Sequence, residues 1–422
     1  MAADLVLATR VLVVTTKRGL KVWERGFKDW SYFDRRSLVV REGKLPKYWH
    51  FYPRVIVGWG SIAKLAATLC TMPWDLVILD ESHYAKSPDT ARTKGAYGDV
   101  GSDNFDHAKA PFAHAKYFWD LTGTPFPNTE VDTYPMLRAL APERLKAGQG
   151  GAGSPDVSNY DDFFNRYCQW RPKQIGRGSW AKTLRVPVQG KNTEELTARM
   201  KGFWLRRTQK DVGIRAPLHE LLYLEPERSD LRDLGASLDD IGLTLDDFLD
   251  AAATDEFGSL EASMAELRRL TGEIKARLLV PLLSEELDDT GSKVVLMCWH
   301  HGVMDFLTDK LARFNPVVVN GRTTHTAADR AQERFAEDDE CRVFIGQIVA
   351  CGEAIDLSCS SELIFVESSF VPKDMKQAAL RITNHNQTKW PRVRVATLEG
   401  TIDEPLQGSV IRKVASIRKV ET

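Results

Sequence analysis

Two carboxylates stand together at the end of an apolar run in the segment WDLVILDESHYAKS (74–87). The run ends in Asp80, Glu81 follows directly, and Ser82 and His83 come next. In open parallel sheets, ligands bind at the carboxyl ends of the strands. A carboxylate there can hold Mg²⁺, mostly through water, and a second one can polarise an attacking water. The pair therefore predicts a metal-assisted hydrolytic site, although an Asp-Glu pair can also be a capped strand end without chemistry.

A second polar turn follows another apolar run about forty residues later, in YFWDLTGTPFPN (117–128). Its Thr122, Gly123 and Thr124 combine hydroxyl groups with a residue that lets the backbone approach a neighbour closely. Taken alone, this is a strand followed by a tight turn. After the carboxylate pair, it indicates an element that couples the first site to the rest of the molecule.

Short β-branched apolar runs that alternate with helical patterns must position these residues. Such runs are typical of parallel strands covered on both faces. They form two sets, VLVVTT (11–16), RVIVGW (54–59), DLVILD (75–80) and YFWDLTGTP (117–125), then KVVLMCW (293–299), NPVVVNG (315–321), RVFIGQ (342–347) and ELIFVE (362–367). Two sets predict an α/β protein with two domains, each a mostly parallel sheet covered by helices.

The segment between the two sets has a different composition. Residues 220–290 contain nineteen Asp/Glu and six Lys/Arg, and part of this segment has helical spacing of apolar residues. We therefore expect three parts, a first lobe over 1–215, an acidic helical linker or insertion over 216–270 and a second lobe over 271–422.

Composition and charge limit the partners, the compartment and the membrane association that we expect for the chain. The net charge is −1, but residues 1–60 carry twelve Lys/Arg against five Asp/Glu, so the chain begins basic. Six cysteines without a CxxC pair argue against a zinc ribbon or a disulfide framework and predict a reducing compartment. Because no apolar run approaches about 18 residues and charges interrupt the first sixteen, we expect no membrane span and no signal peptide.

At this point the ordered motifs resemble one family. DESHYAKSPDTART (80–93), LTGTP (121–125) and GFWLRRTQKDV (202–212) resemble the first lobe of Swi/Snf-type DNA translocases of helicase superfamily two. The similarity is greatest to the annealing-helicase branch and its phage and bacterial relatives. VVVNGRTTHTAADRAQERFAEDDECRVFIGQIVACGEAIDL (317–357) and FVPKDMKQAALRITNHNQ (370–387) resemble the second lobe, so the resemblance covers nearly the whole chain.

The resemblance implies two RecA-like lobes with ATP and magnesium in the cleft between them. Asp80 would then hold Mg²⁺ and Glu81 would orient water. The other nucleotide-side residues would be Gly352, Gln377 and Arg381, with Arg381 reaching over from the second lobe as an arginine finger. Five residues would couple nucleotide state to the other lobe, namely Ser82, His83, Thr122, Gly123 and Thr124.

The implied partner is double-stranded DNA, held through its phosphates because a translocase does not select sequence. Lys17, Arg18 and Trp23, in VLVVTTKRGLKVWERGF, resemble the motif that grips the DNA backbone, and the Gly352 region is also placed near nucleic acid. Trp59, in VIVGWGSIAKL, is a further candidate for DNA binding, although a tryptophan beside a strand is more often a core residue.

Two departures from the family pattern bear on activity. The sequence contains no Gly-Lys-Ser/Thr, which the family uses to hold the phosphates of ATP, so we expect the first lobe to lack its opening helix–loop unit. In the last motif, Gln377 and Arg381 fit, but Asn384 stands where the family has a second arginine and Asn386 where it has glycine. Asparagine is neutral and too short to replace an arginine finger.

Three hypotheses therefore stay open from the sequence. The chain can be an ATP-dependent DNA translocase whose phosphate-binding loop comes from an upstream polypeptide. It can instead be a DNA-binding pseudo-ATPase that has kept the fold and lost catalysis, or the motor subunit of a restriction-type system. For all three we expect a cytoplasmic protein of a bacterial or phage-infected cell.

Overall fold

A computed structural model gives the fold of the chain as two compact units, residues 1–206 and 207–422, and each is described by itself. The structure describes residues 6–32, 34–109, 111–123, 130–175, 182–205, 207, 209–241, 261–351, 355–369, 372–385, 387–401, 403–404 and 407. Thr124, Gly352, Asn386 and residues 242–260 of the predicted linker lie outside this part of the chain.

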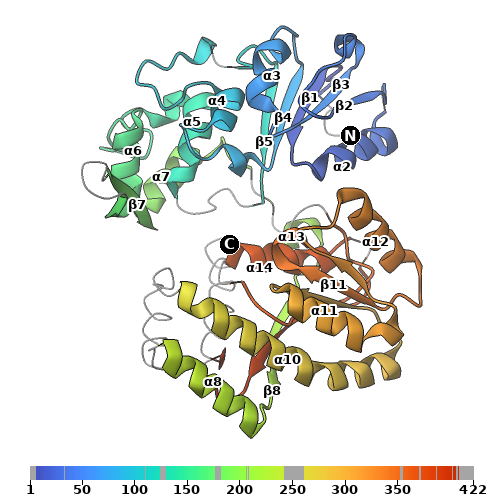
Figure 1. Cartoon of the computed structure of the whole chain (residues 1–422). Helices are drawn as coiled ribbons and strands as arrows, with labels where there is room; N and C mark the ends of the chain where they lie inside the picture. Colours follow the sequence, from blue (N-terminus) through green and yellow to red (C-terminus); the bar gives the residue numbers. More distant parts are fainter. Residues whose placement is uncertain are drawn as a thin grey trace. The chain divides into compact units, whose positions relative to one another are not determined.

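The first unit is built on a five-stranded parallel sheet in the order β2-β3-β1-β4-β5 (Figure 1). Its strands are β1 (Val11–Thr15), β2 (Ser37–Val40), β3 (Arg54–Gly58), β4 (Leu76–Asp80) and β5 (Tyr117–Leu121). Every residue of β1 is buried, which is the pattern of a central parallel strand covered on both faces.

Helices cover both faces of this sheet. Val11 and Val13 pack with Phe27 of α2 (Gly19–Trp30) on one face. Leu12 and Val14 face the other side, where the cluster includes residues of α3 (Ile62–Leu69) and α4 (Ala91–Tyr97). The alternation follows from the period of two along a strand, and Figure 1 shows α2 on the opposite side from α3.

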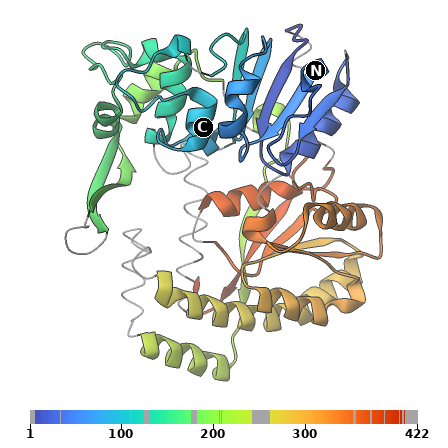
Figure 2. The ribbon, with the colours of Figure 1, turned by 45° about the horizontal axis from the view of Figure 1, so that its top comes forward.

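The rest of the first unit forms a smaller helical region with its own apolar cluster. It contains α5 (Tyr134–Leu140), α6 (Tyr160–Tyr167) and α7 (Thr193–Met200). An antiparallel hairpin of β6 (Cys168–Ile175) and β7 (Lys182–Gly190) extends from α6, as Figure 2 shows.

The second unit is built on a six-stranded sheet in the order β10-β11-β9-β12-β13-β8, again with every pair parallel. The strands are β8 (Leu218–Leu224), β9 (Val294–Cys298), β10 (Val317–Val319), β11 (Val343–Gln347), β12 (Glu362–Phe365) and β13 (Arg392–Leu398). Helices α8 (Arg228–Ile241), α10 (Glu261–Thr290) and α11 (His301–Lys310) supply residues to the cluster on one face. Helices α12 (His325–Glu337), α13 (Ile348–Cys351) and α14 (Pro372–Ala379) supply residues to the other.

The predicted fold class is confirmed, since both units are parallel sheets covered by helices on both faces. Part of the segment predicted as a linker is folded into the second unit. Its residues Leu218–Leu224 form the edge strand β8, and α10 runs across residue 270, where the linker was predicted to end. The runs that form β2, β8 and β13 were not among the predicted strands.

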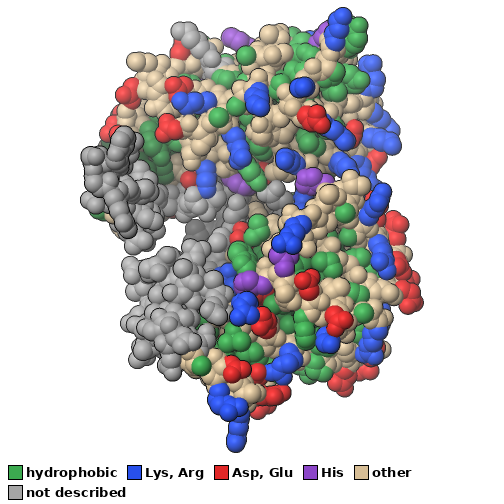
Figure 3. All heavy atoms as spheres, in the orientation of Figure 1, with side chains coloured by type: hydrophobic (Ala, Val, Ile, Leu, Met, Phe, Trp, Pro, Cys, Tyr) green, Lys and Arg blue, Asp and Glu red, His purple; other side chains and the backbone are tan. Residues whose placement is uncertain are grey.

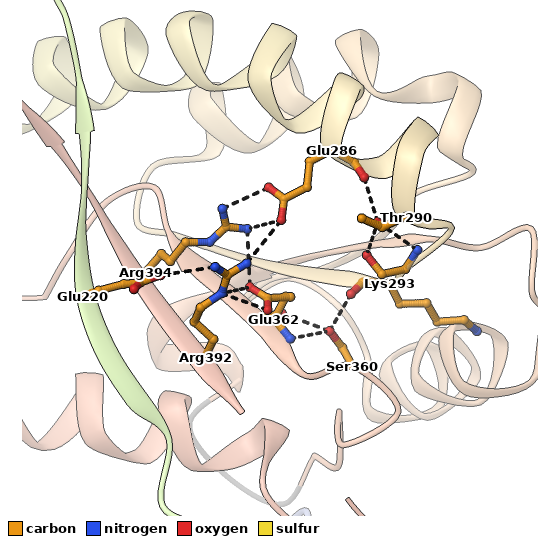
Figure 4. A network of polar contacts seen from close by, with 9 residues as sticks. Glu220, Glu286, Thr290, Lys293, Ser360, Glu362, Arg392 and Arg394 are labelled. Atoms are coloured by element: carbon orange, nitrogen blue, oxygen red, sulfur yellow. Dashed lines mark hydrogen bonds and ion pairs between the residues drawn. The ribbon is translucent and has the colours of Figure 1, made fainter. Parts of the chain in front are cut away.

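A charged network fastens α10 to the amino-end side of the second sheet (Figure 4). Arg392 Nε lies 3.0 Å from both carboxylate oxygens of Glu362, and the Arg394 guanidinium donates at 2.9 Å to both oxygens of Glu286 on α10. Because Arg394 and Glu362 are largely buried, these bonds compensate groups that have lost water. We therefore assign the network a structural role. It lies at the edge of the sheet opposite to the carboxyl ends of the strands.

In the part of the chain that the structure describes, no helix combines the length and the apolar character that crossing a membrane requires.

Candidate functional site at the carboxyl edge of the first sheet

The carboxylate pair lies at the carboxyl edge of the first sheet. β4 ends at Asp80, which is half-buried, and Glu81 directly after it has φ 53° and ψ 49°. A residue other than glycine rarely adopts this left-handed conformation, and such strain persists where the surrounding structure fixes it. The turn begins a short 3₁₀ helix, Ser82–Ala85, so the chain reverses direction at the predicted site.

Two donors fix the Asp80 carboxylate. Thr15 Oγ1 at the end of β1 donates to Asp80 Oδ2 at 2.7 Å, and Trp23 Nε1 of α2 donates to the same oxygen at 2.9 Å. Gly19 lets α2 approach this closely, because a Cβ there would lie 2.0 Å from Thr15 Oγ1. Among the described residues, Asp80 Oδ1 receives no such bond, so one oxygen is held and the other is left for a ligand.

Trp59 also serves this position. Its ring is 3 % exposed, and its Nε1 donates to the backbone carbonyl of Asp80 at 2.8 Å. The burial does not support the predicted contact of Trp59 with DNA, because its face packs in the core cluster of the sheet. Trp23, predicted with the DNA-gripping residues, likewise directs its ring N–H to Asp80. In both cases the indole N–H finds a partner at the site, as buried tryptophans usually do.

A histidine connects the ends of β4 and β5. His83 Nδ1 lies 3.1 Å from Glu81 Oε2 and 3.1 Å from Thr122 Oγ1, and its side chain is 8 % exposed. The tautomer decides whether Nδ1 donates its proton or accepts one from the Thr122 hydroxyl. Ser82 is buried beneath the turn, and Gly123 is exposed after Thr122. The structure thus brings Glu81, His83 and Thr122 together, whereas Thr124 lies outside the described residues.

Behind this edge lies a buried ionisable pair that the sequence did not reveal. Tyr97 of α4 donates its hydroxyl to Asp120 Oδ2 at 2.7 Å. Asp120 Oδ1 is buried without a hydrogen-bond partner among the described residues. Burial raises the pKa of Asp120 to about 7, although the bond from Tyr97 acts in the opposite direction. Asp120 stands two residues before Thr122, so a titrating group adjoins the turn that contacts His83.

The predicted DNA-contacting residues lie at the same edge. Lys17 is exposed and Arg18 is half-buried, and both occupy the short turn between the end of β1 and the start of α2. Thr16 Oγ1 accepts from the backbone N–H of Gly19 at 3.2 Å and so shapes this turn. A cation at this place can contact phosphate without touching Asp80.

The carboxyl edge of the second sheet has its own buried carboxylate, which the sequence did not single out. Glu367 is 2 % exposed, and its Oε2 accepts from the backbone N–H groups of Trp299 and His300 at 2.8 and 2.9 Å. Its Oε1 lies 2.5 Å from His300 Nδ1. A Cβ on Gly272 would lie 2.6 Å from Glu367 Oε1, so α10 needs glycine here. The cluster fixes the loop after β9.

The predicted arginine-finger motif lies on and after α14. Gln377 is half-buried, and Arg381 belongs to the 3₁₀ turn Leu380–Ile382, where its carbonyl accepts from Leu357 N at 2.9 Å. Asn384 donates to Asp356 Oδ2 at 3.0 Å, so it has a structural contact of its own. Because Asp80 and Arg381 belong to different units, the predicted approach of Arg381 to the nucleotide stays a prediction.

The residues present fit magnesium better than they fit a nucleotide. Asp80 offers a fixed carboxylate with one oxygen left for water, which suits Mg²⁺ because that ion keeps several waters. The described residues include no cluster of three His, Cys, Asp or Glu side chains that could hold a metal by themselves. For the phosphates, the sequence offers no Gly-Lys-Ser/Thr loop. The residues present therefore offer a ligand for the metal but no such loop for the phosphates.

Comparison with known proteins finds relatives of one kind. The chain is 21% identical over 369 residues to the "DNA annealing helicase and endonuclease ZRANB3" of Homo sapiens, covering 85% of this chain and 31% of that protein. It is 25% identical over 355 residues to the Caenorhabditis elegans homologue of "SWI/SNF-related matrix-associated actin-dependent regulator of chromatin subfamily A-like protein 1", covering 82% and 45%. The chain thus spans about a third to a half of the length of these relatives. No family model matches it.

Among solved structures, the chain is similar to the "Sulfolobus solfataricus SWI2/SNF2 ATPase core in complex with dsDNA", with a TM-score of 0.37 and 17% identity over 94% of this chain and 78% of that one. The homologues are SWI2/SNF2-family helicase-like proteins, which confirms the predicted resemblance. The human and Caenorhabditis elegans homologues are eukaryotic, so they do not test the expected phage or bacterial branch.

Proposed function

We propose, from its homology to SWI2/SNF2-family helicase-like proteins, that this chain is the motor module of an ATP-dependent DNA translocase. One observation carries the proposal within the structure. Asp80 ends a buried parallel strand, and Thr15 and Trp23 hold one of its oxygens at 2.7 and 2.9 Å. Such orientation of a carboxylate is what a metal-assisted phosphoryl-transfer site requires, because the metal needs a fixed ligand geometry.

Each residue at this edge then has a role in the proposal. Asp80 Oδ1 would hold water on Mg²⁺, and Glu81 would orient the attacking water. His83 would transmit the state of this turn to Thr122 at the end of β5, since it lies 3.1 Å from both Glu81 and Thr122. ATP and magnesium supply the phosphoryl group and the charge stabilisation when bound. Gln377, Arg381 and Gly352 would contribute from the second unit.

We propose that an upstream polypeptide supplies the phosphate-binding loop, because the sequence contains no Gly-Lys-Ser/Thr. The β5 edge of the first sheet is the candidate place for a strand of that polypeptide. β5 is an edge strand, and among the described strands it pairs only with β4. An unpaired parallel edge can accept a further strand through its backbone groups. A strand added there in parallel would end beside Thr122, at the edge that carries Asp80.

A second candidate is a DNA-binding pseudo-ATPase. It is favoured by the absence of a Gly-Lys-Ser/Thr loop and by Asn384 at the position of an arginine finger, where its amide is engaged by Asp356. Both candidates share duplex DNA as the partner, so hydrolysis of ATP separates them.

The Asp80→Asn substitution tests the motor. The chain by itself is expected to hydrolyse ATP no faster than a blank without protein, whether or not duplex DNA is present. Mixed with an upstream-encoded polypeptide that carries a phosphate-binding loop, it is expected to show DNA-stimulated hydrolysis. Asp80→Asn should lower that rate on the order of 10²-fold, since a metal ligand supplies several kcal/mol of transition-state stabilisation and each 1.36 kcal/mol is a factor of ten. Phosphate release at saturating Mg²⁺-ATP measures both rates.

Asp75→Asn is the matched control, because Asp75 stands just before the same strand at its other end and only fixes Thr9 and Arg10 there. It should leave hydrolysis unchanged. If ATP hydrolysis stays at the background rate in every mixture with the upstream-encoded polypeptide while duplex DNA still binds, the motor is rejected and the pseudo-ATPase is favoured. Turnover by the chain alone that Asp80→Asn abolishes would reject the pseudo-ATPase.

The double substitution Lys17→Ala/Arg18→Ala tests the duplex contact. We expect weaker binding of duplex DNA at all sequences and a salt dependence of log K that is shallower by about 1.8, because each phosphate contact contributes about 0.9 to the slope. Fluorescence anisotropy titrations between low and physiological salt measure it. Lys116→Ala is the control, since Lys116 is exposed and precedes β5 at the opposite edge of the sheet. An unchanged slope in the double variant would remove Lys17 and Arg18 from the DNA surface.

A further inference from the structure

The connection between β2 and β3 displays aromatic rings to solvent. Trp49 is 9 % exposed and anchors this connection against Trp74, with ring centroids 6.3 Å apart. Around it, Tyr48 is 60 % exposed, Phe51 is 66 % exposed and Tyr52 is 38 % exposed. Rings this exposed contribute little to the core of the first unit, so the fold does not explain them. We call residues 47–52 the aromatic loop.

The exposed rings lie side by side. The ring centroids of Tyr48 and Phe51 are 6.2 Å apart, and those of His50 and Phe51 are 4.3 Å apart. Lys47 Nζ lies 5.7 Å from the centroid of the Tyr48 ring. The aromatic loop therefore combines neighbouring π-faces with a cation on a single short segment.

The surroundings of the aromatic loop are basic. Residues 34–53 contain five Lys/Arg, one Asp and one Glu in a chain of net charge −1, and Asp34 pairs with Arg36. All five cations are exposed, namely Arg35, Arg36, Arg41, Lys44 and Lys47. Figure 3 shows Lys and Arg side chains gathered on the side of the first unit that carries α2, β2 and β3. The charge complements an anionic partner, and it opposes a second copy of the same surface by like-charge repulsion.

The aromatic loop also lies away from the site already described. It directly precedes Arg54, the first residue of β3, and Arg54 pairs with Val11 at the start of β1. It is therefore at the amino edge of the first sheet, whereas Asp80, Lys17 and Arg18 are at the carboxyl edge of the same rigid sheet. Bases on the rings of this loop would make a different contact from the proposed duplex contact, whereas Lys44 lies toward the carboxyl edge, since a Cβ on the adjacent Gly43 would be 3.2 Å from Ser61 Oγ after β3.

We propose that the aromatic loop binds single-stranded nucleic acid, with bases stacked on Tyr48 and Phe51 and phosphates held along Lys44 and Lys47. Base stacking on exposed aromatic rings beside a basic track is the general chemistry of binding to single strands. A duplex does not fit the rings, because its base faces are already stacked on one another and only its backbone and groove edges are open. The contact would hold an unpaired strand on the same unit that engages the duplex.

The test measures binding without ATP, on the full chain. Fluorescence anisotropy compares labelled oligodeoxythymidine, oligouridine and a duplex of the same length. The Tyr48→Ala/Phe51→Ala variant is expected to bind the single strands at least about tenfold more weakly, given the strength of base–aromatic stacking, and to bind the duplex as before. Lys44→Ala/Lys47→Ala should make the salt slope for single strands shallower by about 1.4, at about 0.7 per phosphate contact.

Tyr223→Ala/Trp390→Ala is the matched control, because these rings are 49 % and 55 % exposed but belong to the second unit. It should bind single strands like the unaltered chain. Since all four rings are exposed, near-UV circular dichroism should report native folding in both variants. Preference for oligodeoxythymidine or for oligouridine identifies the natural strand as DNA or RNA, and either result supports the proposal.

Three results would overturn it. One is that neither single strand binds to the unaltered chain, and another is that Tyr48→Ala/Phe51→Ala binds both as tightly as the unaltered chain. The third is self-association in sedimentation velocity that this variant abolishes, which would assign the aromatic loop to a second copy. If the unaltered chain binds single strands but not the duplex, the proposed function is contradicted and this inference still stands. The two outcomes can be told apart because single strands and duplex are titrated separately.

Discussion

Replacing Arg199 by methionine is expected to lower the free energy of unfolding of the first unit by about 3–5 kcal/mol, because removal of one partner from a buried ionic network leaves the others unsatisfied. Arg199 on α7 is fully buried. Its guanidinium donates to five acceptors, which are Tyr167 Oη at 2.6 Å, the carbonyls of Arg144, Lys146 and Pro155 at 2.7, 2.9 and 2.6 Å, and Glu195 Oε1 at 3.3 Å. Arg199 thus joins α6, α7 and the connection between α5 and α6.

Urea unfolding followed by tryptophan fluorescence measures this effect as a lower midpoint for the transition of the first unit. Arg166→Met is the control, since Arg166 contacts the same Glu195 but is 39 % exposed. Without Arg166, Glu195 still accepts from Tyr167 and Arg199, and Arg166 itself reaches solvent, so the control should shift the midpoint less than Arg199→Met does. Equal shifts in the two variants would show that the burial of Arg199 is not what makes it important.

Replacing Asp120 by asparagine is expected to stabilise the first unit above pH 7 and to remove a pH dependence that the unaltered chain shows. Burial raises the pKa of Asp120 to about 7 in the folded chain, whereas an unfolded aspartate has a pKa of about 3.9. Asparagine keeps the shape and the acceptor for the Tyr97 hydroxyl, but it carries no charge. The substitution therefore removes the cost of ionising a buried carboxyl.

The direction of this effect follows from proton binding. Between about pH 4 and pH 7 the folded chain holds the proton on Asp120 and the unfolded chain does not, so stability falls as pH rises through this window. Above pH 7 both states are ionised and the loss is complete. At 1.36 kcal/mol per pKa unit, the loss amounts to roughly 2–4 kcal/mol. Below about pH 4, both states are protonated and Asp120→Asn should have little effect.

Free energies of unfolding measured from pH 4 to pH 8 for both proteins give the difference curve. Tyr97→Phe provides a second check, because the Tyr97 hydroxyl is the donor that lowers the pKa of Asp120. Without that donor the pKa should rise further, and the window of falling stability should extend to higher pH. A difference curve that is flat across this range would mean that Asp120 stays ionised in the folded chain.

The pair also bears on the proposed coupling. Asp120 precedes Leu121 and Thr122, and Thr122 Oγ1 lies 3.1 Å from His83 Nδ1. In the register of the sheet, Asp120 pairs with Leu79 and Leu121 pairs with Asp80. A charge that forms on Asp120 is therefore created next to the turn through which Asp80 and Thr122 would communicate.

Much of the fold could be predicted because local sequence determined it. Continuous apolar runs such as VLVVTT and KVVLMCW can be buried only as covered parallel strands, and β1 and β9 are buried along their whole length. The position of Asp80 followed for the same reason, since the run before it must end at the carboxyl edge. β8 was missed because Leu218–Leu224 is a half-exposed edge strand without a continuous apolar run.

The candidate site depended more on tertiary structure. Trp23 was predicted to contact DNA and Trp59 was considered both for DNA and for the core, and nothing in their neighbours along the chain points to Asp80. Their indole N–H groups reach Asp80 only because β1, β3 and β4 are adjacent in the sheet and Gly19 lets α2 come close. Arg199 and Asp120 look like ordinary charged residues in sequence, and folding alone decides that each is buried.

By itself, then, the sequence determined the strands that form continuous apolar runs, where Asp80 and Glu81 stand, and the resemblance to Swi/Snf-type translocases, because all three depend on residues that are close along the chain. Three features depend on the tertiary structure alone. They are the donors that hydrogen-bond to Asp80, the hydrogen bond between Tyr97 and Asp120, and the exposure of the Tyr48 and Phe51 rings to solvent. The physical reason is that hydrogen bonding and burial depend on residues from different strands and helices, and their adjacency is set by the order of the strands in the sheet.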